Sequence, residues 1–399
     1  MKSKINILYI YHVSSIGGGS FCLLNLIKKL DKELYNPIVL LKEYGPLCVD
    51  LEKLGAKVFF EKSISMVPYN RSLLELNSIK FVYSVLKSLK KVNNLIKELS
   101  VDIVYVNSMM LYPYLYIAHR LKKKTVIHIR EHWPQKEHRF QFKLAQNIIK
   151  RYSDRIIAIN EFSAGLIGDN DKTKIIYDWI DFSERDEKIN FVELFGKDFK
   201  SLKIFLFLGG TMRIKGALDV VDVFSNQILS KDVRLLLVGC DNKEVEYNGF
   251  KGKIAKVLSR INYNTYSNKV KLLAQKDDRI VFIPTTYQVK SLIEQSFCLV
   301  SFFTIPHANL AIAESTWLGK LSIAADTPEA KEYTADGKAA LLFKMNDKEE
   351  FRTKVLYTLE HDNFNGENQM IGQSIIRKKF DPDRNAKSLN DIYQDMLLQ

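Results

Sequence analysis

Residues 203–221 read KIFLFLGGTMRIKGALDVV, and this stretch indicates the fold class. An apolar run ends at two glycines, and a segment with helical periodicity follows a short basic turn. A short apolar run bounded by a glycine turn is typical of a buried strand that leads into a helix. The sequence therefore predicts a strand–turn–helix unit in which Gly210, Arg213 and Lys215 lie in the turn.

The composition of this turn favours an anion-binding site. Backbone amides of the turn and the positive end of the following helix attract negative charge. Arg213 and Lys215 add two full charges, and a guanidinium can hold phosphate oxygens with two hydrogen bonds. The alternative is an ordinary connection whose charged side chains are solvated.

Short apolar runs alternate with helical segments along almost the whole chain. They are rich in Ile, Val and Leu, which is typical of parallel strands buried on both faces. The alternation predicts a doubly wound α/β fold. The expected strands are residues 5–11, 37–41, 57–60, 102–106, 125–129, 155–159, 203–208, 234–239, 279–283, 298–303, 321–325 and 339–343.

A chain of 399 residues is too long for one ordinary core, so we expect two Rossmann-like domains that face each other across a cleft. The charged stretch 181–201 is a plausible linker between them. The expected domains are residues 1–185 and 200–380. Residues 381–399 are expected to form a terminal helix that packs back on the first domain.

The net charge of +13 lies in the first part of the chain, because residues 1–150 hold 24 Lys and Arg against 11 Asp and Glu. Such a field attracts an anionic polymer or an anionic membrane surface. A lysine-rich helical stretch within residues 66–100 has either a solvated face or a membrane-contacting one. No recognition helix, zinc finger or RNP pattern supports nucleic-acid binding. The polar, basic insertion at 241–276 carries no pattern that predicts its role.

The four cysteines lie in or beside apolar runs without a CxxC pair, which indicates reduced core cysteines in a cytoplasmic protein. The chain begins with lysines and apolar residues, like a signal peptide, but a short run and the sequence SSIGGGS favour a first strand and turn. No apolar stretch approaches the ~18 residues that span a bilayer.

Three further groups of residues are candidates for a site at the carboxyl ends of the strands. The glycines Gly18 and Gly19 follow the first strand and permit close approach of a ligand. His128, Arg130 and Glu131 end another strand, where a polar substrate is a better expectation than a metal ion. In residues 306–343, Asn309 is a helix N-cap candidate and Glu314 either faces a cleft or is an exposed helical residue.

Taken together, these motifs resemble glycosyltransferase family 4, the retaining nucleotide-sugar glycosyltransferases of GT-B fold. The resemblance covers nearly the whole chain and rests on GGGS, RIIAINEFSAGLI with KIIYDWIDF, FLFLGGTMRIKGALDVVDVF, LLLVG and IAESTWLGKLSIAADTPEAKEYTADG. It implies that Gly18, Gly19 and Gly210 lie at the donor, that Arg213 and Lys215 neutralise its diphosphate, and that Glu314 holds the ribose hydroxyls. The acceptor is expected at His128, Arg130 and Glu131, although Arg130 and Glu131 stand where many family members have a histidine and an acid.

The chain departs from the family pattern at Pro306, where many members have a glutamate near the donor sugar. His307, or the backbone amides around Asn309 and Leu310, are expected to make the sugar and phosphate contacts there. The resemblance implies transfer of a sugar from a UDP- or GDP-sugar with retention of configuration. Fixed cations would replace a metal ion, and no cofactor is expected.

The expected acceptor is a lipid-linked saccharide at the inner face of the cytoplasmic membrane, as in the biosynthesis of O-antigen, capsule or other surface polysaccharides. The chain would then be cytoplasmic and bound peripherally to anionic lipid. One alternative is a non-catalytic GT-B subunit that binds a sugar or nucleotide in an assembly complex. Another is a sugar-nucleotide epimerase of the same fold.

Overall fold

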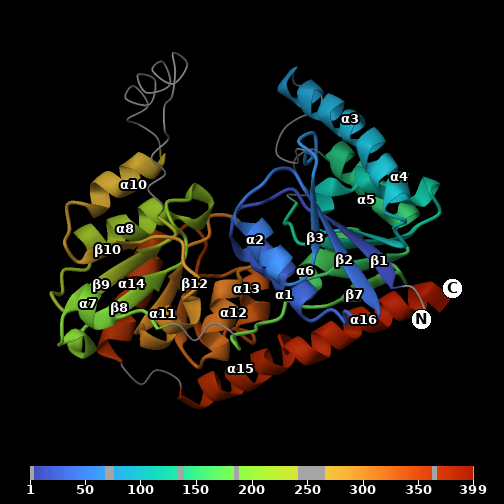
Figure 1. The fold of residues 1–399 in the computed structure, drawn as a ribbon. Helices are drawn as coiled ribbons and strands as arrows, with labels where there is room; N and C mark the ends of the chain where they lie inside the picture. The colour runs from blue at the N-terminus through green and yellow to red at the C-terminus, as the bar shows by residue number, and fades with distance from the viewer. Residues whose placement is uncertain are drawn as a thin grey trace. The chain divides into compact units, whose positions relative to one another are not determined.

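The computed structural model describes residues 4–67, 76–133, 139–183, 188–240, 266–361 and 366–398 (Figure 1). The chain forms two compact units. Unit 1 comprises Met1–Asp181 with Lys379–Gln399, and unit 2 comprises Phe182–Lys378. Each unit is built around one sheet in which every neighbouring pair of strands is parallel. The predicted α/β class, with two Rossmann-like units, is therefore confirmed.

The sheet of unit 1 has seven strands in the order β3-β2-β1-β4-β5-β6-β7. Most apolar side chains of the inner strands are buried on both faces, as the Ile- and Val-rich runs predict, whereas Phe60 at the edge of the sheet is 46% exposed. The strands are β1 Ile5–Ile10, β2 Tyr35–Leu41, β3 Lys57–Phe60, β4 Ile103–Val106, β5 Lys124–Ile129, β6 Arg155–Ala158 and β7 Thr173–Ile175.

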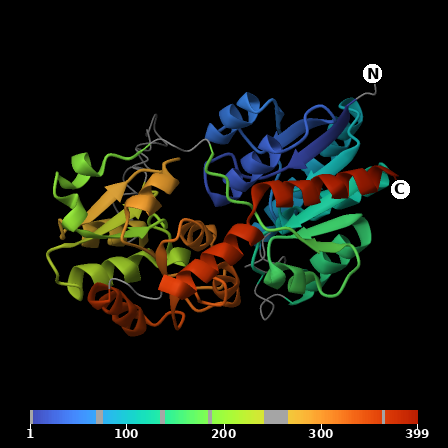
Figure 2. The same ribbon diagram turned by 90° about the horizontal axis from the view of Figure 1, so that it is seen from below.

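Helices cover both faces of this sheet. On one face, a core cluster joins the strands to α3 Leu76–Glu98, α4 Pro113–Arg120, α5 Arg139–Tyr152 and α6 Glu161–Ile167. On the other face, a second cluster joins them to α1 Gly18–Lys28, α2 Pro46–Lys53 and α16 Pro382–Leu398. Figure 2 shows the terminal helix α16, in red, lying along unit 1, where Leu389, Ile392 and Tyr393 are buried.

The sheet of unit 2 has six strands in the order β10-β9-β8-β11-β12-β13. The strands are β8 Lys203–Phe207, β9 Val233–Val238, β10 Ile280–Ile283, β11 Cys298–Ser301, β12 Leu321–Ala325 and β13 Ala340–Phe343. The described helices of this unit are α7 Phe191–Phe195, α8 Ala217–Asn226, α10 Tyr266–Ala274, α11 Val289–Gln295, α12 Leu310–Trp317, α13 Pro328–Tyr333, α14 Lys348–Glu360 and α15 Gly366–Lys379. One large cluster packs α8, α10 and α14 against the strands.

All twelve predicted strands are present, and their bounds differ from the prediction by at most two residues at either end. Strand β7, which the described residues contain in addition to these twelve, was not predicted, because Thr173–Ile175 is short and contains a lysine. All four cysteines are buried, as predicted, and no disulfide joins them. The first apolar run forms strand β1, Ile5–Ile10, as predicted.

Three predicted segments fall partly outside the described residues. Of the insertion at 241–276, the structure describes α10 and the two residues that follow it, and residues 241–265 lie outside the description. The helical stretch predicted within 66–100 is α3, and residues 68–75 before it lie outside the description. The boundary between the units, after Asp181, falls in the predicted linker, of which residues 184–187 are not described.

Candidate functional site

In unit 2, the strand order reverses between β8 and β11, because β9 and β10 extend to one side and β12 and β13 to the other. Ligands of open α/β sheets bind at such a reversal, beyond the carboxyl ends of the strands. Residues 208–216 and 302–309 follow these two strands. Two hydrogen bonds join these loops. The backbone N of Thr304 donates to the Ile214 carbonyl at 3.0 Å, and the Oγ1 of Thr304 donates to the same oxygen at 3.2 Å.

Two glycines shape the turn after β8. Gly210 has φ +53°, and a Cβ there would lie 2.5 Å from the carbonyl oxygen of Gly239 after β9. Gly216 has φ +69°, and its Cβ would lie 2.3 Å from the carbonyl oxygen of Phe302 after β11. Both positions therefore require glycine for conformation and for space. The turn is held against both neighbouring strands.

The two cations of the turn have different surroundings. Arg213 and Lys215 lie in a short 3-10 helix, Arg213–Lys215, directly before α8. The Nζ of Lys215 donates to the Leu208 carbonyl at 3.0 Å, and burial lowers the pKa of this lysine. Arg213 is exposed, and no carboxylate of the described residues pairs with it. Its guanidinium carbon lies 5.0 Å from the ring centroid of Tyr266. Arg213 thus keeps its capacity to bind an anion.

The loop after β11 leads into α12, which carries Glu314. That side chain is buried, so the alternative of an exposed helical glutamate is wrong. Asn309 occupies the N-cap position of α12, as predicted, but its side chain makes no capping hydrogen bond. Its Nδ2 instead donates to Ser301 Oγ at 2.5 Å, which ties the loop to the end of β11. The ring of His307 packs edge-on against Phe303.

Unit 1 has its own reversal of strand order, between β1 and β4. The loop after β1 contains the glycines before α1. A Cβ on Gly18 would meet no atom within 4 Å, whereas one on Gly19 would lie 2.6 Å from the hydroxyl oxygen of Tyr11. Space for a ligand is therefore open at Gly18 and limited by a side chain at Gly19. Their donor-binding role stays a prediction.

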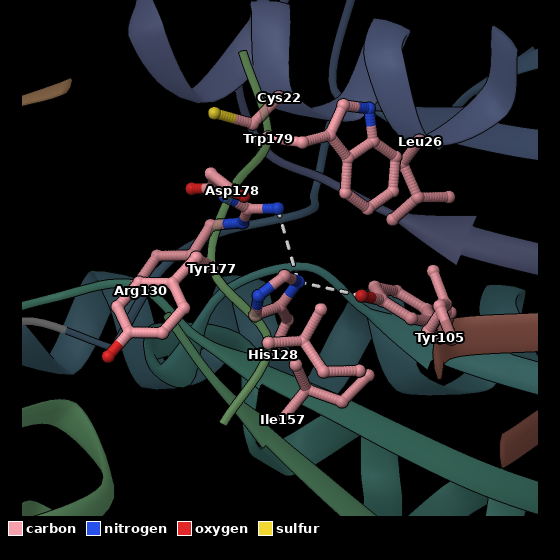
Figure 3. A pocket seen from close by; sticks show the side chains of 11 residues that line it. Cys22, Leu26, Tyr105, His128, Arg130, Ile157, Tyr177, Asp178 and Trp179 are labelled. Atoms are coloured by element: carbon pink, nitrogen blue, oxygen red, sulfur yellow. Dashed lines mark hydrogen bonds and ion pairs between the residues drawn. The ribbon is translucent and has the colours of Figure 1, made fainter. Parts of the chain in front are cut away.

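Arg130 is the centre of a buried polar network at the ends of β4 and β5 (Figure 3). Its guanidinium forms an ion pair with Asp178, donates from Nε to Asn107 Oδ1 at 3.0 Å, and lies 3.1 Å from His128 Nδ1. Burial alone would lower the pKa of Arg130, but Asp178 reverses this effect and raises it. The guanidinium is therefore permanently charged, and each of its three nitrogens has a partner within unit 1.

His128 is neutral in this network. Tyr105 Oη lies 2.6 Å from His128 Nδ1, and the Arg130 guanidinium also reaches this nitrogen. Because arginine can only donate, Nδ1 is the acceptor and the ring proton lies on Nε2. Burial and the charge of Arg130 hold the pKa of His128 well below its usual range. Figure 3 shows the imidazole between Tyr105 and Arg130, beside a cavity with room for about one water molecule.

Glu131 also has partners inside unit 1. Its carboxylate accepts from the Ser108 hydroxyl and from the backbone N of Met109 at 2.8 Å, at the start of a 3-10 helix, Met109–Leu111. Burial raises the pKa of Glu131, and these hydrogen bonds oppose the rise. The predicted acceptor-binding residues His128, Arg130 and Glu131 are thus brought together. Their contact with an acceptor remains a prediction.

Sequence reasoning missed several members of these sites. Asp178 could have been found, because a carboxylate in the apolar segment KIIYDWI needs a partner. Tyr105, Asn107 and Tyr266 gave no signal, since their partners are between 23 and 53 residues away along the chain. Within the described residues there is no group of three or more His, Cys, Asp or Glu that could hold a metal ion. No helix in the described ranges is long and apolar enough to cross a membrane.

Two family models match the chain. The model described as Glycosyltransferase Family 4 matches residues 16–184, and the model described as Glycosyl transferases group 1 matches residues 202–361. Together the matches span most of the sequence, one in each unit. No curated protein matches this sequence.

Several solved structures have the same fold. The Anabaena protein Alr3699/HepE in complex with UDP-glucose is 17% identical, with a TM-score of 0.73 over 98% of this chain and 100% of that chain. A glycosyltransferase from Rickettsia africae is 18% identical, with a TM-score of 0.71 over 99% of both chains. Sucrose-phosphate synthase from Thermosynechococcus elongatus is 12% identical, with a TM-score of 0.70 over 99% of this chain and 100% of that chain. At these identities the likeness shows the fold alone, which is GT-B.

Proposed function

The chain belongs to glycosyltransferase family 4, and on this basis we propose that it transfers a sugar from a nucleoside diphosphate sugar to a saccharide acceptor with retention of configuration. One observation carries the proposal: the strand-order reversal in unit 2 is flanked by the turn with Arg213 and Lys215 and by the loop that leads to Glu314. Cations for a diphosphate and a carboxylate for a ribose diol are the groups that a nucleotide donor requires.

The donor is proposed to bind at this edge of unit 2. Arg213 supplies the charge that faces the phosphates, Lys215 supports the turn from within, and Glu314 accepts hydrogen bonds from the ribose. His307 and the amides around Asn309 and Leu310 are proposed to contact the sugar. The UDP-glucose bound to HepE supports a uridine nucleotide, and a guanosine nucleotide is the other candidate.

The chemical step is proposed to be a front-face displacement. Negative charge develops on the leaving diphosphate, and preorganised donors aimed at that charge stabilise the transition state. Arg213, Lys215 and backbone amides serve this purpose, so that the reaction does not require a metal ion. The leaving phosphate accepts the proton of the acceptor hydroxyl, and no enzymic nucleophile takes part.

The acceptor is proposed to be a lipid-linked saccharide, of the kind from which surface polysaccharides are built, presented at the cytoplasmic face of an anionic membrane. Helix α3 supports this part, because Ile79, Val82, Tyr83 and Leu86 are exposed at helical spacing. The exposed lysines Lys87, Lys90 and Lys97 follow on the same helix. Apolar side chains flanked by lysines are typical of a membrane-contacting helix.

The first turns of α5 present a similar surface. Phe140 is 78% exposed and Leu144 is 37% exposed. Arg139 and Lys143 lie beside them and are exposed as well. Because α4 packs against both α3 and α5, the three helices lie on one face of unit 1. We therefore assign the membrane contact to this face.

A non-catalytic GT-B subunit is the second candidate, favoured by Pro306 where many family members have a glutamate. Incubating the protein with UDP- and GDP-sugars and with lipid-linked saccharides extracted from bacterial membranes separates the two. Release of nucleoside diphosphate that depends on the acceptor, with a sugar of retained configuration in the product, supports the enzyme. Binding of nucleotide without turnover for any donor supports the subunit. Interconversion of free donor sugars without an acceptor identifies an epimerase instead.

A further inference from the structure

Helix α10 contacts the turn after β8 through its first two residues. Tyr266 Oη accepts a hydrogen bond from the backbone N of Leu218, in the first turn of α8, at 2.8 Å. The ring of the same tyrosine lies beneath the guanidinium of Arg213. Ser267 Oγ shares a hydrogen bond of 2.7 Å with Thr211 Oγ1. One tyrosine thus contacts both the exposed cation of the turn and the start of the following helix.

The hydroxyl of Tyr266 has a proton to donate. Since its oxygen accepts from the Leu218 amide, its own O–H can point elsewhere. No atom of the described residues accepts that proton. Burial raises the pKa of Tyr266, so the phenol stays protonated at neutral pH. A hydroxyl that accepts from an amide at a helix N-terminus is polarised toward donation.

We propose that Tyr266 is a donor-binding residue whose hydroxyl donates a hydrogen bond to a phosphate oxygen of the nucleoside diphosphate. The hydroxyl extends the positive end of α8 to the ligand, and the ring keeps the guanidinium of Arg213 beside it through a cation–π contact. This inference rests on the proposed function, because it adds a ligand to the same diphosphate site. It also gives α10 a role: the helix completes the site from outside the turn.

A purely structural role for Tyr266 would have a different signature. Replacing the hydroxyl leaves the Leu218 amide without its partner under either role, and with a purely structural role this would be its whole effect. Affinity for phosphates would not change relative to affinity for the nucleoside. The two roles therefore separate when ligands with and without the diphosphate are compared on the same variant.

The test is calorimetric titration of the full chain with UDP, GDP, uridine and guanosine. Tyr266→Phe keeps the ring beneath Arg213 and removes only the hydroxyl. We expect the nucleoside diphosphate that binds the wild type to bind this variant about tenfold more weakly, as for one hydrogen bond to a charged group. Binding of the matching nucleoside should not change. The control, Ser267→Ala, removes the neighbouring contact to Thr211 and should leave both affinities unchanged.

Each other outcome overturns the proposal in a recognisable way. If Tyr266→Phe binds the diphosphate as tightly as the wild type does, the hydroxyl is no ligand, and the proposed function stands without it. If Ser267→Ala loses as much affinity as Tyr266→Phe, the effect belongs to the packing of α10. If the wild type binds neither UDP nor GDP, the proposed donor site itself fails, and the role of Tyr266 fails with it.

Discussion

At the scale of single residues, Arg130, Lys215 and Arg213 differ in whether their positive charge has an acceptor inside the fold. Arg130 is neutralised by Asp178, and Lys215 donates to a backbone carbonyl, so each has an internal acceptor. The guanidinium of Arg213 lies over the ring of Tyr266 and pairs with no carboxylate of the described residues. An exposed cation without a carboxylate partner loses no internal ion pair when it binds an anion. We therefore expect Arg213 to contribute more to diphosphate affinity than Lys215 does.

The same reasoning gives a pH dependence for His128. Its pKa is well below the value of about 6.5 that an unfolded chain has. Below that pH the unfolded chain binds a proton that the folded chain cannot bind, so the free energy of unfolding falls as the pH falls. His128→Asn keeps an acceptor for Tyr105 and Arg130 but cannot titrate. Between pH 7.5 and 5.0, the variant should lose about 2 kcal/mol less unfolding free energy than the wild type.

Urea unfolding at the two pH values measures this difference. In a Trp317→Phe background, the remaining tryptophans, Trp133 and Trp179, both lie in unit 1 and report on it. His361 belongs to unit 2, so His361→Asn is the control and should leave the unfolding of unit 1 unchanged. Burial also lowers the pKa of His12, to about 4, so part of the acid sensitivity remains in every variant. An equal loss in His128→Asn and in the wild type would contradict a neutral, locked imidazole.

At the scale of elements, the strands were predictable because their residues are apolar on both faces and the runs have the length of strands. The polar networks were not predictable from the sequence, because their members come together only when particular strands become neighbours in the sheet. The sequence places His128 and Arg130 together, but Asp178 lies 48 residues after Arg130 and reaches it because β7 pairs beside β6 in the sheet. Tyr266 meets Arg213 only through the packing of α10 on α8.

Helix α3 carries the prediction for the membrane contact. We expect the full chain to bind vesicles that contain anionic lipid, with an affinity that falls as salt is added. Lys87→Gln/Lys90→Gln/Lys97→Gln should weaken binding by about a hundredfold, since each basic residue contributes about 1 kcal/mol near such a surface. Tyr83→Gln/Leu86→Gln should weaken it by about tenfold or more through lost apolar burial. Cosedimentation with vesicles measures both effects.

Matched substitutions in unit 2 serve as controls for these variants. Lys197→Gln/Lys200→Gln/Lys231→Gln removes the same charge from exposed sites, and Leu229→Gln removes a side chain that is 75% exposed. Neither should change vesicle binding appreciably. Equal losses in both units would mean that net charge alone drives binding. Binding that ignores both salt and anionic lipid would contradict a basic membrane-contacting face.

At the scale of the whole molecule, the two units have the same architecture but different chemistry. The net positive charge of the chain lies within residues 1–150, all of which belong to unit 1, whereas residues 151–399 carry 35 basic and 35 acidic residues. Beside the reversal of strand order in unit 2 lie the exposed Arg213 and the buried Glu314. Beside the reversal in unit 1 lie Gly18, which has free space around it, and the ion pair of Arg130 with Asp178. This division supports a nucleotide in unit 2 and an acceptor at a charged surface in unit 1.

The measurement that tests this division most directly is thermal unfolding of the full chain with UDP, GDP and their sugars. The variants are Glu314→Ala and Arg213→Ala/Lys215→Ala, with Lys197→Ala/Lys200→Ala as the control for lost charge. A ligand at 100 times its dissociation constant should stabilise the protein by about 2.7 kcal/mol. We predict stabilisation of the wild type and the control by one base family, and its loss in both site variants. No response of the wild type to any nucleotide, or an unchanged response in both site variants, would contradict a donor site in unit 2.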